Sequence, residues 1–144
     1  MYRIKDRSRS KENYNYISDD RFNKLTIKAR KQGAIIIRGG KEVEDHLDAM
    51  GANASCINDI LFFRQKVTIS EVLEETRHFE QYIEGLNNDK PETIRTILNE
   101  IDAKKYIIRN AKKYRIPKKE LEETIFQLQE YELLLSAQED NSDV

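Results

Sequence analysis

The chain has little cysteine and no long apolar run, and each shortage excludes a class of protein. Cys56 is the one cysteine among 144 residues, so no internal disulfide can form. We expect this thiol to be buried and inert within a strand, which fits a reducing, cytoplasmic compartment. No apolar run approaches the roughly 18 residues of a membrane-spanning helix, and the start, MYRIKDRSRS, lacks the apolar stretch of a signal peptide. A membrane role is therefore not expected.

Net charge is also nearly absent. The 25 Lys and Arg residues balance 26 Asp and Glu residues, which leaves a formal net charge of −1. Without a global field, the chain has no general attraction for nucleic acid or anionic lipid. Its length fits one domain. We expect this domain over residues 19–137, between a flexible basic arm at 1–18 and an acidic disordered tail at 138–144.

The first half of the chain shows alternating helical and strand patterns. The predicted elements are a helix from Asp19 or Asp20 to about Gly33, a strand over 34–37, a helix over 41–50, and a hairpin or one long strand over 52–63. The strand over 34–37 is continuously apolar and mostly β-branched, which is typical of a fully buried strand. Gly51 should end the second helix. Asn58-Asp59 marks the turn if residues 52–63 form a hairpin.

Three helices are predicted in the second half. The first begins at Thr68, which forms a capping box with Glu71, and it ends near Gly85. The second ends near Tyr114 and the third begins near Lys118. The third has apolar residues in steps of three and four, which indicates packing on a neighbouring helix, with a dimeric coiled coil as the alternative. The sequence therefore predicts an α+β fold with a small β-sheet and a helical C-terminal half.

The helix that begins at Thr68 carries side chains that could share one metal ion. Glu74 and His78 are four residues apart and point the same way, with Gln81 beside them. Their face is either plain solvent-exposed surface or part of a covered cleft. Because two ligands hold a divalent ion weakly, a third must come from elsewhere. Glu100 and Asp102 are the available carboxylates, placed between apolar residues of the next helix, and nearby cations could neutralise Asp102 instead.

Three segments together resemble compact zincin metallopeptidases. They are ILFF at Ile60–Phe63, TISEVLEETRHFEQ at Thr68–Gln81 and NEIDAKKYIIRNAKKY at Asn99–Tyr114. The pattern is similar to the ImmA/IrrE-like peptidases and to the zincin-like peptidase domains of bacterial polymorphic toxins and phage proteins, over about residues 34–136. The resemblance implies a minimal zincin-like fold, in which a strand borders the cleft, an active-site helix bears ligands and a downstream helix supplies an acidic ligand.

Carried over to this chain, the resemblance implies Glu74, His78 and Asp102 as metal ligands and Glu75 as the general base. Glu74 stands where these enzymes have a first histidine, and Asp102 is one methylene shorter than their usual glutamate. Two carboxylates and one imidazole suit Zn²⁺, and also Mn²⁺ or Fe²⁺. The implied activity is hydrolysis of a peptide bond in a protein or peptide substrate, in a toxin- or phage-associated bacterial protein.

Two other functions remain open from the sequence. The missing first histidine fits a catalytically inactive zincin-like domain without a metal, whose helical half binds a protein partner. A nucleic-acid-binding module would use the basic arm and the lysine pairs at 104–105, 112–113 and 118–119. The balanced net charge argues against this module. The sequence does not indicate an oligomeric state.

Overall fold

The computed structural model describes residues 14–142 and divides into two compact units. Of the described residues, 14–84 form the first unit, which we call the sheet unit, and 85–142 form the second, which we call the hairpin unit. The single domain predicted for residues 19–137 spans both units, and each is described by itself. Most of the predicted basic arm, residues 1–13, lies outside the described part of the chain. The α+β fold class predicted from the sequence is confirmed.

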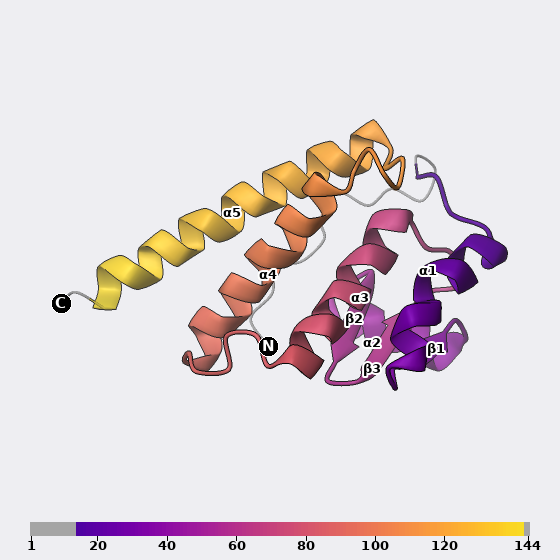
Figure 1. The fold of residues 1–144 in the computed structure, drawn as a ribbon, viewed down its shortest axis with the longest axis horizontal. Coiled ribbons are helices and arrows are strands. Elements are labelled where there is room, and N and C mark those ends of the chain that lie inside the picture. Colours follow the sequence, from indigo (N-terminus) through magenta and orange to yellow (C-terminus); the bar gives the residue numbers. More distant parts are fainter. Residues whose placement is uncertain (1–13, 143–144) are drawn as a thin grey trace. The chain divides into compact units, whose positions relative to one another are not determined.

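The described residues of the sheet unit form three helices and three strands. Its elements are α1 (Asp19–Lys31), β1 (Ile35–Arg38), α2 (Lys41–Met50), β2 (Ala54–Ile57), β3 (Ile60–Phe63) and α3 (Ile69–Glu84) (Figure 1). The cap of α1 is Ser18, since the Arg21 N–H donates to Ser18 Oγ at 3.2 Å. Gly51 ends α2 in the left-handed conformation with φ of 66°, as predicted.

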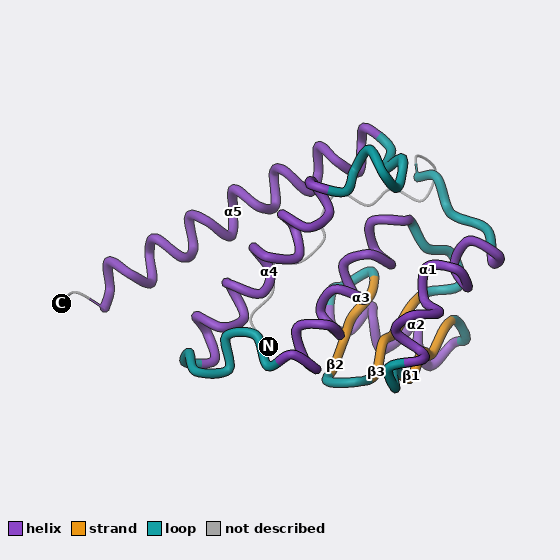
Figure 2. Tube along the Cα trace, viewed as in Figure 1, coloured by secondary structure: helices purple, strands orange, loops and turns teal. Residues whose placement is uncertain are grey.

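The three strands form one mixed sheet in the order β1-β3-β2 (Figure 2). β2 and β3 are antiparallel and form the hairpin, which settles the alternative left by the sequence for residues 52–63. Asn58, with φ of 56°, provides the positive φ that a short hairpin turn needs. β1 lies parallel to β3, with Ile35 opposite Ile60.

β1 is an edge strand, and the prediction that it would be fully buried was wrong. Ile35 is 50% exposed and Ile37 is 38% exposed, whereas Ile36 packs against the core. A continuous apolar run is typical of a strand whose two faces are both covered by other elements. In this sheet, α2 packs against Phe62 of the neighbouring β3, and much of the β1 surface on that face stays open.

The core of the sheet unit lies between the sheet and the helices α1 and α3. Phe22 of α1 meets Phe63 of β3 edge to face, with ring centroids 5.2 Å apart. Val72 and Phe79 of α3 complete this core. Cys56 is buried in β2, as predicted, and contributes to the same cluster. The packing fixes α3, the helix with the candidate ligands, against a rigid sheet.

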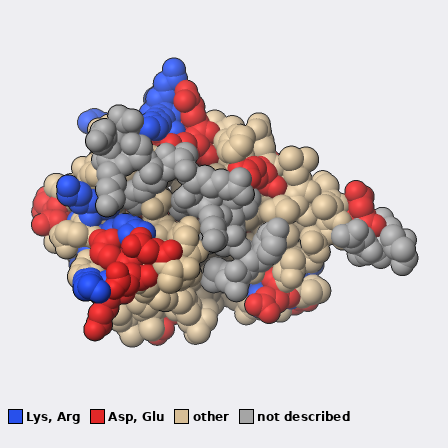
Figure 3. Space-filling model, turned by 180° about the vertical axis from the view of Figure 1, so that it is seen from behind, with Lys and Arg blue, Asp and Glu red and all other residues tan. Residues whose placement is uncertain are grey.

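Ion pairs tie the surface of the sheet unit together. The guanidinium of Arg64, which follows β3, contacts the carboxylates of Glu44 and Asp48 on α2. Burial lowers the pKa of Arg64, but its hydrogen bonds to these two carboxylates raise it more, so the net pKa is above its ordinary value. Arg64 is therefore charged at any physiological pH. On the face shown in Figure 3, acidic and basic side chains lie next to one another rather than in a uniform field.

The capping box predicted at the start of α3 is confirmed. The Thr68 N–H donates to Glu71 Oε1 at 3.0 Å, and the Glu71 N–H donates to Thr68 Oγ1 at 3.3 Å. We expect Thr68→Ala to lower the free energy of unfolding by about 1 kcal/mol, because a backbone N–H loses its acceptor. Thr68→Ser is the control, since it loses the same methyl group but keeps the hydroxyl. Equal destabilisation of both variants in urea unfolding would show that the methyl packing, and not the cap, is what matters.

The hairpin unit consists of α4 (Glu92–Arg109) and α5 (Lys118–Ser142), which run in opposite directions (Figure 1). Ile97 and Ile101 of α4 pack against Tyr131 of α5. α4 ends five residues before the predicted Tyr114, because the Asn110 amide donates to the Tyr106 carbonyl at 2.8 Å and satisfies the helix end. α5 continues to Ser142, past Gln138, where the sequence predicts a disordered tail. Among the described residues, no helix is long and apolar enough to span a membrane.

Candidate metal centre

The polar face of α3 is buried rather than open to solvent. Glu74 is 9% exposed and Gln81 is 2% exposed, and 13% of the His78 side chain is exposed. The face is therefore not the plain solvent-exposed surface that the sequence allows as one outcome. A carboxylate and an imidazole that lose their water must find other partners or a cation. The face is therefore a candidate binding site and not ordinary helix surface.

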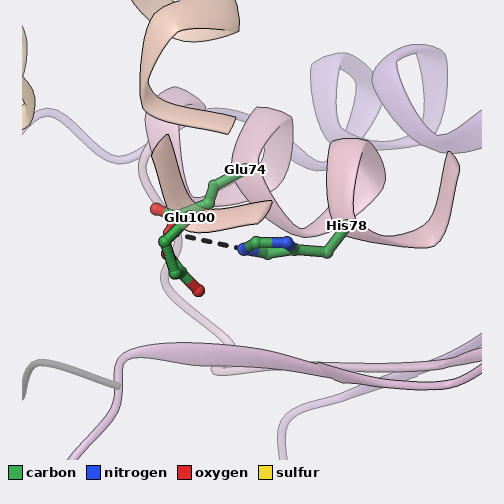
Figure 4. A group of neighbouring side chains, drawn as sticks. All are labelled: Glu74, His78 and Glu100. Atoms are coloured by element: carbon green, nitrogen blue, oxygen red, sulfur yellow. Dashed lines mark ion pairs between the residues drawn. The ribbon is translucent and has the colours of Figure 1, made fainter. Parts of the chain in front are cut away.

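Glu74 and His78 point toward each other, as predicted from their spacing. His78 Nε2 lies 3.7 Å from Glu74 Oε1, and this pair is drawn in Figure 4. The distance exceeds the 2.7–3.2 Å of an ordinary N–H···O hydrogen bond. Two ligands that each lie about 2.1 Å from one ion are roughly 3.0 to 3.4 Å apart at octahedral or tetrahedral angles. The observed spacing is within a few tenths of an ångström of what a shared ion requires.

Gln81 orients the imidazole of His78. His78 Nδ1 lies 2.8 Å from Gln81 Oε1. An amide oxygen only accepts, so this contact places a hydrogen on His78 Nδ1 and leaves Nε2 on the side of Glu74. Histidines that bind metals typically donate their other ring N–H in this way, which fixes the ring and its tautomer. Gln81 thus holds the ring of a candidate ligand, and its spacing of three residues from His78 is the sequence signal for this contact.

Glu75, the predicted general base, is the most buried acid of α3. It is 1% exposed and lies about 100° round the helix from Glu74. Its position is therefore beside the Glu74–His78 pair and not between the two side chains.

The two acids of α4 differ in their surroundings. Glu100 is 2% exposed and lies on the same helix face as Ile97, Lys104 and Ile107, all of them buried. Asp102 is two residues further on, about 200° round the helix, and only partly buried. One face of a helix cannot direct both carboxylates to the same point. Of the two acids, Glu100 is the more deeply buried.

The second histidine of the chain provides a comparison. His46 is on α2, four residues after Glu42, so it repeats the Glu-x-x-x-His spacing of the candidate site. Its ring packs against Phe62, with centroids 4.8 Å apart, and Glu42 is exposed. The same spacing thus gives an aromatic packing contact on α2 and a buried pair of possible ligands on α3. Spacing alone does not distinguish the two.

The comparisons with known proteins do not add a relative from which function could be transferred. No family model, curated protein or solved structure matches the chain.

Proposed function

We propose that this chain is a zincin-like, metal-dependent peptidase in which Glu74 and His78 hold the ion and Glu75 is the general base. The observation that carries the proposal is the buried Glu74–His78 pair with its supporting Gln81. The substrate class is a protein or peptide. The sequence predicts a third ligand from the helix that follows, and of its two candidates, Glu100 and Asp102, the more deeply buried Glu100 is the first to test.

The charges of Glu74, His78 and a carboxylate as third ligand suit a divalent cation. Two carboxylates carry two negative charges, and the neutral imidazole adds a nitrogen ligand without adding charge. A bound Zn²⁺, Mn²⁺ or Fe²⁺ would balance the carboxylates, which are costly to bury otherwise. The alternative for the α3 pair is an ion pair between Glu74 and a protonated His78. Such a pair needs no metal, so metal content separates the two.

The chemistry follows from where the residues lie. The bound ion would polarise a peptide carbonyl and lower the pKa of a water molecule. Glu75 would accept a proton from the attacking water and deliver it to the departing nitrogen, so that water is added across the broken C–N bond. Gln81 would keep the His78 ring in one orientation throughout. Each of these tasks uses a side chain that is already buried and held on a rigid helix.

The deciding experiment is metal content by mass spectrometry of protein purified without a histidine tag. We expect about one equivalent of Zn²⁺ or Mn²⁺ in the wild type after dialysis and none in Glu74→Ala/His78→Ala. Glu42→Ala/His46→Ala is the matched control, because it removes the same residue types at the same spacing on α2 and should keep the metal. Circular dichroism verifies that all three proteins are folded.

Absence of metal from the folded wild type, even after addition of Zn²⁺ or Mn²⁺ at neutral pH, would refute the peptidase proposal. The α3 pair would then be an ion pair, and the chain would fit the inactive zincin-like domain that binds a protein partner. Loss of metal from the control as well would assign binding to scattered surface histidines and acids.

A further inference from the structure

Helix α5 has apolar side chains on two opposite sides. Tyr131, on one side, is buried in the core of the hairpin unit. On the opposite side, Phe126 is 63% exposed and Leu133 is 72% exposed. These two are seven residues apart, which places them two turns apart on one stripe. A helix that is apolar on two sides is expected to pack against another element on each side. We therefore expect this stripe to bind a partner.

The same side of α5 has opposite charges near its two ends. Lys119 precedes Phe126 by seven residues, and Asp140 follows Leu133 by seven. Both charged residues are exposed. Two α5 helices laid side by side in parallel would set lysine against lysine and aspartate against aspartate. Laid antiparallel, they would set each lysine level with an aspartate, so the charge pattern favours the antiparallel arrangement.

We propose that two copies of this chain associate through this stripe, with their α5 helices antiparallel about a two-fold axis midway between Phe126 and Leu133. That axis sets Phe126 beside the partner's Leu133. It also sets Lys119 beside the partner's Asp140, because the two spacings of seven residues are equal. Every contact occurs twice in such an interface.

The first test is sedimentation velocity of the full chain over a range of concentrations. We expect a monomer–dimer equilibrium for the wild type, and a dissociation constant at least about tenfold higher for Phe126→Glu and for Leu133→Glu. Ile27→Glu is the control, since it places the same charge on an exposed apolar position of α1 and should leave the dimer unchanged. A wild type that stays monomeric at every concentration would overturn the proposal.

The second test exchanges the charges. Lys119→Glu and Asp140→Lys should each weaken the dimer roughly threefold, since exposed ion pairs contribute modestly. An equimolar mixture of the two variants should dimerise as well as the wild type, because both contacts in the mixed dimer again join opposite charges. A mixture that is no stronger than the separate variants would contradict the antiparallel pairing.

The third test locates the axis by disulfide cross-linking in a Cys56→Ala background. The exposed Gln129 lies next to the axis, so Gln129→Cys should give a covalent dimer on mild oxidation. The two copies of residue 136 would be about 20 Å apart along the helices, so Ser136→Cys should not cross-link. Efficient cross-linking at both positions would indicate a parallel pair and overturn the antiparallel arrangement.

Discussion

Replacing the carboxylate of Glu75 by an amide should abolish most peptide hydrolysis without loss of the metal. In Glu75→Gln we expect turnover of a fluorescein-labelled casein to fall by about 100- to 10,000-fold, the usual contribution of a general base. The amide has nearly the same shape as the carboxylate but cannot accept a proton at neutral pH. Glu75 lies beside the Glu74–His78 pair and is not one of the proposed ligands, so the metal content should stay near one equivalent.

Glu80→Gln is the matched control for this prediction. Glu80 is also on α3, but it is paired with Arg77 at 3.0 Å and is not part of the Glu74–His78 pair. The same chemical change there should leave turnover within about twofold of the wild type, as for most substitutions outside a site. Undiminished hydrolysis in Glu75→Gln would exclude Glu75 as the base. Loss of metal together with activity would instead make Glu75 a ligand or a residue that supports one.

The parts of the fold that the sequence predicts correctly depend on neighbours along the chain. The capping box of Thr68 and Glu71 is a contact over three residues, and Gly51 ends α2 through its own backbone conformation. The hairpin of β2 and β3, one of the two alternatives that the sequence leaves for residues 52–63, has a turn at Asn58, whose positive φ is a local property as well. Such features need no knowledge of distant residues, so sequence patterns capture them.

The features that the sequence does not predict depend on distant residues. The apolar run of β1 cannot show that its strand lies at the edge of a sheet, where Ile35 and Ile37 stay partly exposed. Likewise, the burial of the polar face of α3 is not visible in the spacing of Glu74 and His78. The spacing aligns the two side chains on one face, whereas tertiary packing removes the water from around them.

The choice between Glu100 and Asp102 as third ligand depends partly on local sequence and partly on distant residues. Both acids have apolar neighbours in the sequence, so their neighbours do not distinguish them. Only the resemblance to zincins selects Asp102. The helical phase contains more information, because Ile97, Glu100, Lys104 and Ile107 recur in steps of three and four and mark one stripe. The structure confirms that this stripe is the buried side of α4. Phase analysis of the sequence would therefore have favoured Glu100.

Substitutions of the two acids of α4 should have very different effects on the dissociation constant for Zn²⁺. We expect Glu100→Gln to raise the dissociation constant for Zn²⁺ by more than about 100-fold, since even residues that only support a ligand contribute 10- to 100-fold. Asp102→Asn should change it by less than about threefold, because Asp102 points to another side of the helix. Competition with a chromogenic chelator measures both values on the folded chain.

The two variants, Glu100→Gln and Asp102→Asn, also distinguish a metal ligand from a residue that forms a structural ion pair. Lys104 is buried one turn after Glu100 on the same face, so Glu100 could serve only to neutralise this lysine. In that case Glu100→Gln would lower the free energy of unfolding and leave metal affinity unchanged. Weaker binding in Asp102→Asn alone would return the third ligand to the residue that the zincin resemblance selects. Unchanged affinity in both variants would mean that α4 supplies no ligand, and the site would reduce to Glu74 and His78.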